Sequence, residues 1–283
     1  MKLALCLSGE VRTWEYCNHT IETAFPNCEV DIYATMWTRS SYVDQNKVLA
    51  RKPKKAYLIS DNDTYITQCK EFEEQVLTNT FEHYKGRIFD SWKFLPIYML
   101  PRIERMARFS YDLIPDPTQY DYIIRSRYDH IYLKNIAEQL EESKLLLTED
   151  IGGSAPWDMI GNWRMEYDGF AAGTPYTMHQ YYQFTDWLPH YYEDDFCKDK
   201  LFKAESTLGL YINKIKSFNV KHTRDILGMQ ITENDYYNRT KPMDSGKSIT
   251  NKRAVTLQQY KETLKKMHPK IYEKYNVEDM ICA

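Results

Sequence analysis

A short apolar run that ends in a group of charged residues, within segment 121–133, constrains this chain most. The run contains two adjacent isoleucines, which are typical of a buried β-strand, and Arg125, Arg127, Asp129 and His130 follow it directly. Charged side chains there are costly to bury unless they are paired or face a ligand. Ligands of open α/β sheets bind beyond the carboxyl ends of the strands. The segment therefore predicts either a strand that delivers charged groups to a binding site or a structural ion pair.

The residue types in this segment suit a phosphorylated ligand. The planar guanidinium group of arginine donates two parallel hydrogen bonds to phosphate oxygens. A neighbouring carboxylate suits a hard divalent cation, which itself binds phosphate oxygens. We therefore expect Arg125, Arg127 and Asp129 to lie at a phosphate-binding site.

The order of predicted elements is typical of a Rossmann-like α/β domain. Strands are predicted at residues 3–7, 30–37, 56–59, 121–124, 167–175 and 218–220, and helices at 13–23, within 91–112, and at 176–192, 203–215 and 256–274. We expect one domain over residues 1–233, with a central mixed sheet flanked by helices. Residues 234–283 are predicted to form a polar, lysine-rich helical extension packed on the same domain.

Composition limits the classes of function. The 283 residues suffice for one large α/β domain, and the net charge of −3 argues against a general nucleic-acid-binding protein. The 24 tyrosines combine apolar area with a polar tip, which suits stacking against sugars, although compositional bias is the alternative.

The cysteines and the hydropathy pattern bear on the compartment. The six cysteines include no Cys-x-x-Cys pair, so free thiols in a reducing compartment are expected. The apolar run at the N-terminus is too short for a secretion signal, and no segment approaches the roughly 18 apolar residues of a membrane span. We therefore expect a soluble, cytoplasmic protein.

The residues after the first predicted strand form a second candidate region. Ser8 and Gly9 follow Leu7, and a glycine at this point lets a ligand approach the backbone closely. Arg12 lies near enough in the chain to reach a phosphate. The segment lacks the G-x-G-x-x-G pattern, so dinucleotide binding is not supported. The alternative is a simple turn between a strand and a helix.

Three later residues are candidates for chemistry at the same site. Asp168 precedes a predicted turn and suits binding of acceptor hydroxyls, with a turn or helix cap as the alternative. Glu205 lies early in a predicted helix, where the helix dipole favours an acid and where it is also a candidate general base. His222 is a candidate metal ligand or phosphate donor, or a structural histidine.

Four motifs occur together over residues 1–225: Leu-Cys-Leu-Ser-Gly-Glu-Val-Arg-Thr, the aspartate and tryptophan of the second strand, Tyr-Asp-Tyr-Ile-Ile-Arg-Ser-Arg-Tyr-Asp, and Asp-Gly-Phe-Ala-Ala-Gly. This set resembles the GT-A-type glycosyltransferases of large DNA viruses and of bacterial surface-polysaccharide clusters. The resemblance implies a nucleotide-sugar donor, most often a UDP-sugar, and a glycan or glycoprotein acceptor. For a viral protein, it implies glycan biosynthesis in the host cytoplasm.

The resemblance also implies roles for individual residues. The donor-binding positions would be Leu7, Ser8, Gly9, Arg12, Arg125, Arg127 and Asp129. Arg127-Tyr-Asp129 occupies the place of the Asp-x-Asp motif, whose second acid binds Mn²⁺ or Mg²⁺. Asp129 is then a metal ligand, and Arg127, which replaces the first acid, can neutralise the diphosphate directly.

The same resemblance assigns the remaining roles. His222 stands where such enzymes add a histidine to the metal, and Glu205 stands in the region of their catalytic acid, with Asp168 as the other candidate base. A single carboxylate base gives an inverted product. The tyrosines of segment 176–192 are expected to wall the acceptor pocket.

Two other classes of protein fit the same residues. The first is a nucleotidyl- or phosphotransferase on a similar scaffold, and the second is a non-catalytic carbohydrate-binding protein. Independently of these classes, the lysine-rich C-terminal segment leads to the hypothesis of peripheral contact with anionic membranes.

Overall fold

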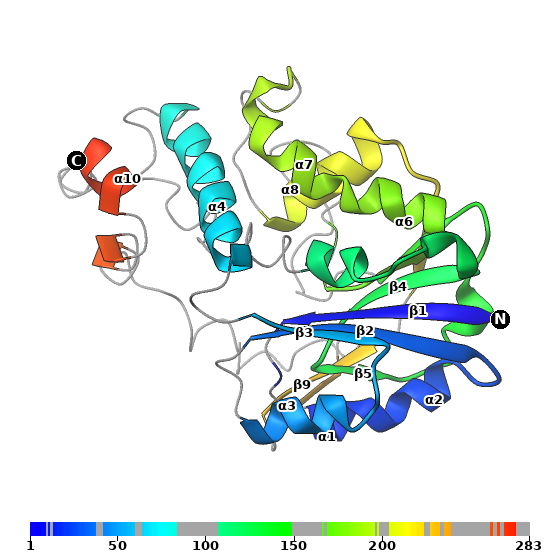
Figure 1. The fold of residues 1–283 in the computed structure, drawn as a ribbon. Helices are drawn as coiled ribbons and strands as arrows, with labels where there is room; N and C mark the ends of the chain where they lie inside the picture. Colours follow the sequence, from blue (N-terminus) through cyan, green and yellow to red (C-terminus); the bar gives the residue numbers. More distant parts are fainter. Residues whose placement is uncertain are drawn as a thin grey trace.

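The fold is known from a computed structural model, which describes residues 1–9, 11, 14–37, 42–59, 64–83, 107–148, 166, 169–195, 197, 204–223, 227–232, 235–238, 261–262, 265–266 and 269–275. A central sheet lies between two layers of helices (Figure 1). The predicted α/β class, with a mixed sheet flanked by helices, is thereby confirmed.

Within the described residues, the central sheet has seven strands in the order β3-β2-β1-β4-β7-β6-β8. Their bounds are Lys2–Gly9 (β1), Glu29–Trp37 (β2), Lys55–Ile59 (β3), Tyr122–Arg127 (β4), Leu145–Thr148 (β6), Ala171–Gly173 (β7) and Val220–Thr223 (β8). Only β7 runs antiparallel to its neighbours, so the carboxyl ends of the other six strands share one edge. This edge is where an α/β sheet binds its ligand.

Apolar residues on the two faces of the sheet pack against different helices. On one face, Leu3, Leu5 and Leu7 of β1 share a core with the helices α1 (Trp14–Cys17), α2 (Ile21–Ala24) and α3 (Tyr42–Leu49). On the other face, Ala4 and Cys6 share a core with the second helical layer. Strands that are covered on both faces carry continuous apolar runs, as β1 does.

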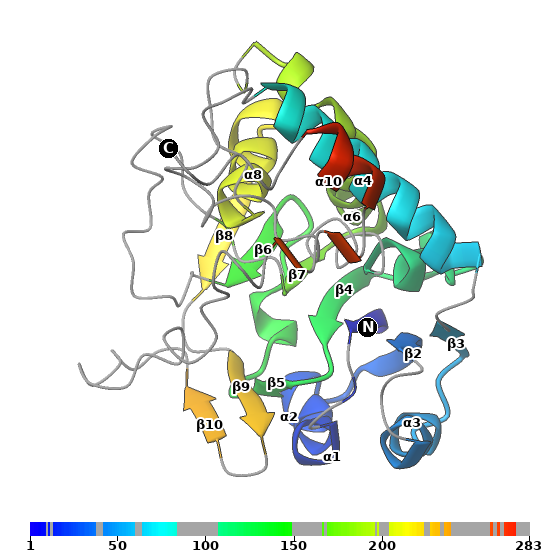
Figure 2. The ribbon, with the colours of Figure 1, turned by 90° about the vertical axis from the view of Figure 1, so that its left-hand side faces the viewer.

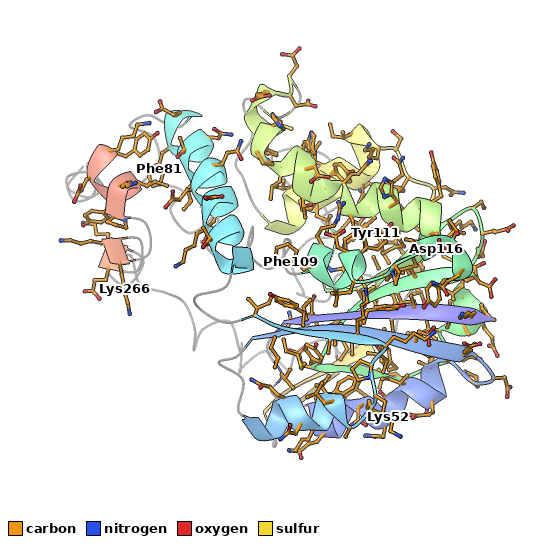
Figure 3. All side chains as sticks on the ribbon, in the orientation of Figure 1. Lys52, Phe81, Phe109, Tyr111, Asp116 and Lys266 are labelled. Carbon is orange, nitrogen blue, oxygen red and sulfur yellow. The ribbon has the colours of Figure 1, made fainter. Side chains whose placement is uncertain are left out.

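The second layer consists of the helical segment 107–112, α6 (Pro175–Tyr182), α7 (Phe184–Trp187), the 3-10 helix η5 (Leu188–Glu193), α8 (Ala204–Leu210) and the π-helix η6 (Tyr211–Ile215). Figure 3 shows the side chains that fill the space between this layer and the sheet, with Phe109 and Tyr111 on segment 107–112. Tyr181, Tyr182 and Tyr191 are at most 2% exposed. The tyrosines predicted to wall a pocket therefore include three that belong to the core.

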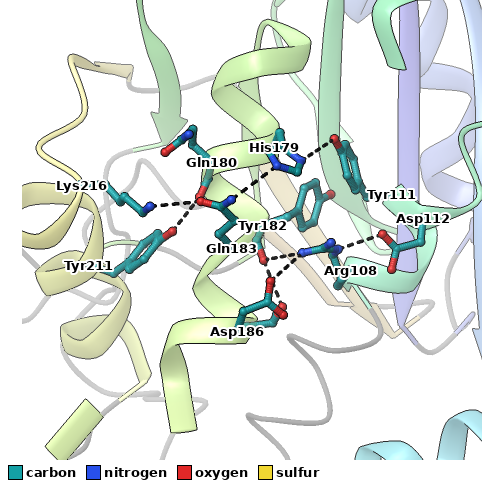
Figure 4. Close-up of polar contacts among 11 residues, drawn as sticks. Arg108, Tyr111, Asp112, His179, Gln180, Tyr182, Gln183, Asp186, Tyr211 and Lys216 are labelled. Carbon is teal, nitrogen blue, oxygen red and sulfur yellow. Dashed lines mark hydrogen bonds and ion pairs between the residues drawn. The ribbon is translucent and has the colours of Figure 1, made fainter. Parts of the chain in front are cut away.

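Polar contacts tie segment 107–112 to the long helical run (Figure 4). Arg108 donates to the carboxylate of Asp112 at 2.8 Å and to the backbone carbonyl of Tyr182 at 3.2 Å. It also contacts Asp186 at 3.3 Å. These bonds fix α6 and α7 over the sheet, and α6 in turn contacts β4.

The helix predicted at 13–23 is divided into α1, the 3-10 helix η1 (Asn18–Thr20) and α2. The Asn18 amide donates to the carbonyl of Trp14 at 2.7 Å and to that of Glu15 at 3.1 Å. An asparagine side chain that bonds nearby carbonyls competes with the regular helical ladder. The break therefore has a local cause.

Residues 227–232 and 235–238 belong to a second sheet, in which the described strands have the order β10-β9-β5. Its strands are His130–Tyr132 (β5), Leu227–Thr232 (β9) and Asp235–Asn238 (β10). Figure 2 shows this sheet beside α1 and α2. The start of the predicted C-terminal extension is therefore a strand.

Helix α10 (Pro269–Lys274) packs on α4 (Thr64–His83). The rings of Phe81 and Tyr275 stack with centroids 5.1 Å apart, and Figure 3 shows Phe81 between the two helices. Tyr275 donates to the Glu82 carboxylate at 2.6 Å. Of the helices in the described part of the chain, none is both long and apolar enough to cross a membrane.

Candidate functional site

Strands that follow β1 in the chain lie on both sides of it in the sheet. From β1 the sheet grows through β2 to β3 on one side, and β4 then joins β1 on the other side. Such a switch point leaves a crevice outside the carboxyl ends of the two strands, where ligands bind in α/β proteins. The residues at the ends of β1 and β4 are therefore the first candidates for a binding site.

Three polar residues form one row across these strand ends. Ser8 pairs in register with Thr35 of β2 on one side and with Arg127 of β4 on the other. Residues paired in this way point to the same face of a sheet. Because Cys6, two residues before Ser8, packs with the α6 layer, the row of three faces that layer.

Gly9 ends β1 with a φ of +119°. An L side chain is strained at this angle, although a Cβ atom there would meet no atom of the described residues within 4 Å. The backbone conformation, not crowding, therefore requires glycine. Close approach of a ligand to the backbone at this end of β1 stays a prediction.

Arg127 and Asp129 form a bidentate ion pair. The Nε of Arg127 lies 2.9 Å from Oδ1 of Asp129, and its Nη2 lies 2.6 Å from Oδ2. The Asp129 side chain is 6% exposed, whereas that of Arg127 is 35% exposed. Asp129 therefore positions a guanidinium group that stays partly exposed, and guanidinium groups bind anions such as phosphate through parallel hydrogen bonds.

Tyr128 fixes this pair to the neighbouring strands. Its hydroxyl donates to the backbone carbonyl of Thr35 at 3.0 Å, and its ring meets Trp14 edge-on at 5.6 Å. Burial raises the pKa of Tyr128 well above its ordinary value, so the hydroxyl remains a donor.

A second set of buried contacts supports the same turn, on the face of the sheet that also buries Tyr128. The backbone N–H of Arg127 donates to Nδ1 of His130 at 3.4 Å, and Ser126 Oγ lies 2.9 Å from the same nitrogen. Tyr132 donates its hydroxyl to Ser126 Oγ at 2.7 Å. Because Nδ1 accepts from a backbone N–H, the His130 ring carries its proton on Nε2.

We expect Tyr128→Phe to lower the free energy of unfolding by about 1–2 kcal/mol, because the buried hydrogen bond from Tyr128 to the Thr35 carbonyl is lost. Thermal unfolding measures this change. The matched control is Tyr122→Phe on the same strand, whose hydroxyl has no hydrogen bond within the described ranges and whose loss should be near zero. Equal losses for the two variants would contradict the role given to Tyr128.

Arg125 lies one row below Arg127 and points into the helical layer. Its Nη1 lies 3.0 Å from the hydroxyl of Tyr181, and the residue is 3% exposed. Arg125 was expected just beyond the strand, but β4 continues through Arg127 and includes it. Its predicted contact with a phosphorylated ligand stays a prediction.

The other predicted residues have different outcomes. Leu7 is fully buried on the α1 face, so only its backbone is at the strand end. Glu205 lies in the first turn of α8, as predicted, but its side chain is outside what the structure describes. Arg12 and Asp168 lie outside the described residues.

His222 lies within β8, where it faces Glu166. The Nε2 of His222 is 2.9 Å and 3.0 Å from the two carboxylate oxygens of Glu166, which is 0% exposed. Asn213 of the π-helix η6 donates to the same carboxylate at 3.3 Å. Glu166 was missed from the sequence, because nothing local connects it to a histidine so far along the chain.

The arrangement does not fit a metal site shared by Asp129 and His222. Each has its own partner, and strands β7 and β6 lie between β4 and β8. Among the described residues, no group of three or more His, Cys, Asp or Glu side chains could hold a metal ion. The predicted binding of Mn²⁺ or Mg²⁺ stays a prediction.

Cys6 lies on β1, two residues before Ser8, in register with Tyr33 and Arg125. Burial raises the pKa of its thiol well above the ordinary value. A thiol that stays protonated is a poor nucleophile, so the structure offers no thiolate chemistry at Cys6.

Comparison with known proteins finds no family model that matches the chain and no matching curated protein.

Proposed function

We propose that this chain is a GT-A-like glycosyltransferase that moves a sugar from a nucleotide-sugar donor, in the first instance a UDP-sugar, to a hydroxyl of a glycan acceptor. One observation carries the proposal. A half-exposed guanidinium group, held by a bidentate carboxylate, lies in register with Ser8 at the switch point of the sheet. An anion with several oxygens, such as a diphosphate, is the ligand that suits this place.

In the proposed reaction, the bond from the anomeric carbon to the donor phosphate breaks, and its electron pair leaves with the nucleoside diphosphate. Arg127 stabilises the negative charge that grows on the departing group. Asp129 acts as a positioning residue, because it fixes the fork of Arg127. The acceptor oxygen forms the new bond to the anomeric carbon as its proton passes to a base.

Arg127 can supply positive charge where the resembling enzymes use a divalent cation. Both oxygens of Asp129 already face the guanidinium group, so donor binding through Arg127 needs no rearrangement of the pair. The proposal therefore includes donor binding that does not depend on Mn²⁺ or Mg²⁺.

A thermal-shift measurement with UDP, GDP, dTDP and CMP, each with Mn²⁺ or with EDTA, tests the proposal. We expect one nucleoside diphosphate to stabilise the protein, by about 2.7 kcal/mol at 100 times its dissociation constant. The stabilisation should persist in EDTA and weaken in Asp129→Ala. Asp112→Ala, which removes a carboxylate paired with Arg108 in the helical layer, is the matched control.

The outcomes separate the alternatives. Stabilisation that disappears in EDTA would mean that the diphosphate binds through a divalent cation. No stabilisation by any nucleotide would contradict the proposed function and favour a carbohydrate-binding protein. Release of pyrophosphate from a nucleoside triphosphate in the presence of a sugar phosphate, with no release of a nucleoside diphosphate from a nucleotide sugar, would identify a nucleotidyltransferase.

A further inference from the structure

We propose that Glu166 and His222 form a catalytic pair in which Nδ1 of His222 takes the proton from the acceptor hydroxyl. This inference rests on the proposed function and deepens it, because it assigns the base of the reaction. The contacts of the pair, its position on the sheet and its burial support it.

The contacts determine which nitrogen of His222 carries the proton. An ionised carboxylate only accepts hydrogen bonds, and Glu166 receives one from Asn213 and faces Nε2 of His222. The proton of the neutral imidazole therefore sits on Nε2, which leaves the lone pair on Nδ1. Within the described part of the chain, Nδ1 makes no hydrogen bond.

The burial of the pair is unequal. Glu166 is completely buried, whereas the His222 side chain is 17% exposed. A buried carboxylate orients the imidazole and stabilises the imidazolium that forms when the ring takes a proton, as in other carboxylate–histidine pairs of enzymes. The exposed part of the ring is the part that an acceptor hydroxyl can reach.

The register of the sheet places His222 on the donor side. Arg125 pairs with Ala171, Ala171 with Leu147, and Leu147 with His222, so these residues lie in one row across four strands. Residues in one row share a face, and Leu147 packs in the same core as Cys6. His222 therefore faces the same side as Ser8 and Arg127.

The separation along the row suits a donor and an acceptor that bind side by side. Strands are about 4.8 Å apart, so His222 on β8 is roughly 14 Å from β4. Both β4 and β8 end at the carboxyl edge of the sheet. The diphosphate would lie at Arg127, and the anomeric carbon and the attacking acceptor hydroxyl would meet beyond the carboxyl ends of the strands, between Arg127 and His222.

The proposed step forms two bonds and breaks two bonds. The acceptor O–H proton moves to Nδ1 of His222, and the oxygen forms the bond to the anomeric carbon. The bond to the donor phosphate breaks, and the nucleoside diphosphate leaves with the electron pair. The imidazolium then loses its proton to water.

The test compares His222→Gln and Glu166→Gln with the wild type for release of UDP from a UDP-sugar in the presence of an oligosaccharide mixture. We expect His222→Gln to lower the transfer rate at least about 100-fold, because a glutamine amide cannot accept the proton. The thermal shift with UDP should stay unchanged. Imidazole added to His222→Ala should restore part of the rate.

The matched control is His190→Gln in η5, because His190 also pairs with a glutamate, Glu193, at 2.8 Å but is exposed. The His190→Gln variant should transfer the sugar as fast as the wild type. The competing bases are tested with Glu205→Gln and Asp168→Asn.

Transfer by His222→Gln at the wild-type rate would overturn the inference and leave the proposed function standing. A 100-fold loss in Glu205→Gln or Asp168→Asn, with His222→Gln unaffected, would overturn it in favour of that base. A wild type that neither binds UDP nor releases it from a UDP-sugar would overturn the proposed function itself, and the catalytic pair with it.

Discussion

Arg127→Met is expected to lower the transfer rate about 1,000-fold, because it removes the guanidinium group that stabilises the departing diphosphate. The methionine side chain keeps much of the length and apolar stem of arginine, so the fold around β4 should persist. Arg127→Lys should recover only part of the rate, since an ammonium group cannot donate two parallel hydrogen bonds. Steady-state kinetics with the UDP-sugar and the thermal shift with UDP measure both effects.

Asp129→Asn separates a positioning role from metal binding. If Asp129 positions Arg127, asparagine keeps one accepting oxygen, and the rate should fall less than in Arg127→Met. The residual activity should not change when EDTA is added. Activity of the wild type that requires Mn²⁺, and that Asp129→Asn abolishes, would contradict the positioning role.

The matched control is Arg51→Met. Arg51 is also partly exposed and paired, because it contacts the Glu22 carboxylate and donates to the side chain of Asn18 at 2.9 Å. Its partners belong to η1 and α2, the elements beside the opposite face of the sheet. The variant should lose some stability and keep its transfer rate. A comparable loss of rate would show that replacing any paired arginine slows the transfer. That result would contradict the specific role given to Arg127 in the mechanism.

Strands β1, β2 and β3 could be predicted from the sequence because their signal is local. The apolar run of β1 and the β-branched and aromatic residues of β2 indicate strands without knowledge of their neighbours. The end of β4 was harder to predict, since its apolar run stops at Ile124 while the strand continues through Arg127. Tyr181 and Asp129 accept hydrogen bonds from the two arginines, and both partners are visible only in the fold.

The elements that were missed lack a local signal or have an ambiguous one. Helix α4 has no strong apolar stripe, and its contacts with α10 and η5 come from distant parts of the chain. Strand β6 is a run of three leucines and a threonine, which fits a strand or a buried helix equally. The contact between Glu166 and His222 depends on the π-helix and on β8, so the sequence gives the residues but not the pair.

Leu5→Ala is expected to lower the free energy of unfolding by about 3 kcal/mol, within the range for buried leucines. Leu5 is fully buried at the middle of β1, the strand between β2 and β4, and it packs in the core with α1 and α2. A loss of this size is a large part of the roughly 5–15 kcal/mol that stabilises a domain, so thermal unfolding should shift by several degrees.

Leu58→Ala is the matched control, because the same atoms are removed from the edge strand β3, where Leu58 is 40% exposed. This variant should lose about 0.5 kcal/mol or less. The comparison tests whether β1 is the buried centre of the sheet, on which the row from Ser8 to Arg127 depends. Equal losses for Leu5→Ala and Leu58→Ala would contradict that placement, and with it the position of the proposed donor site.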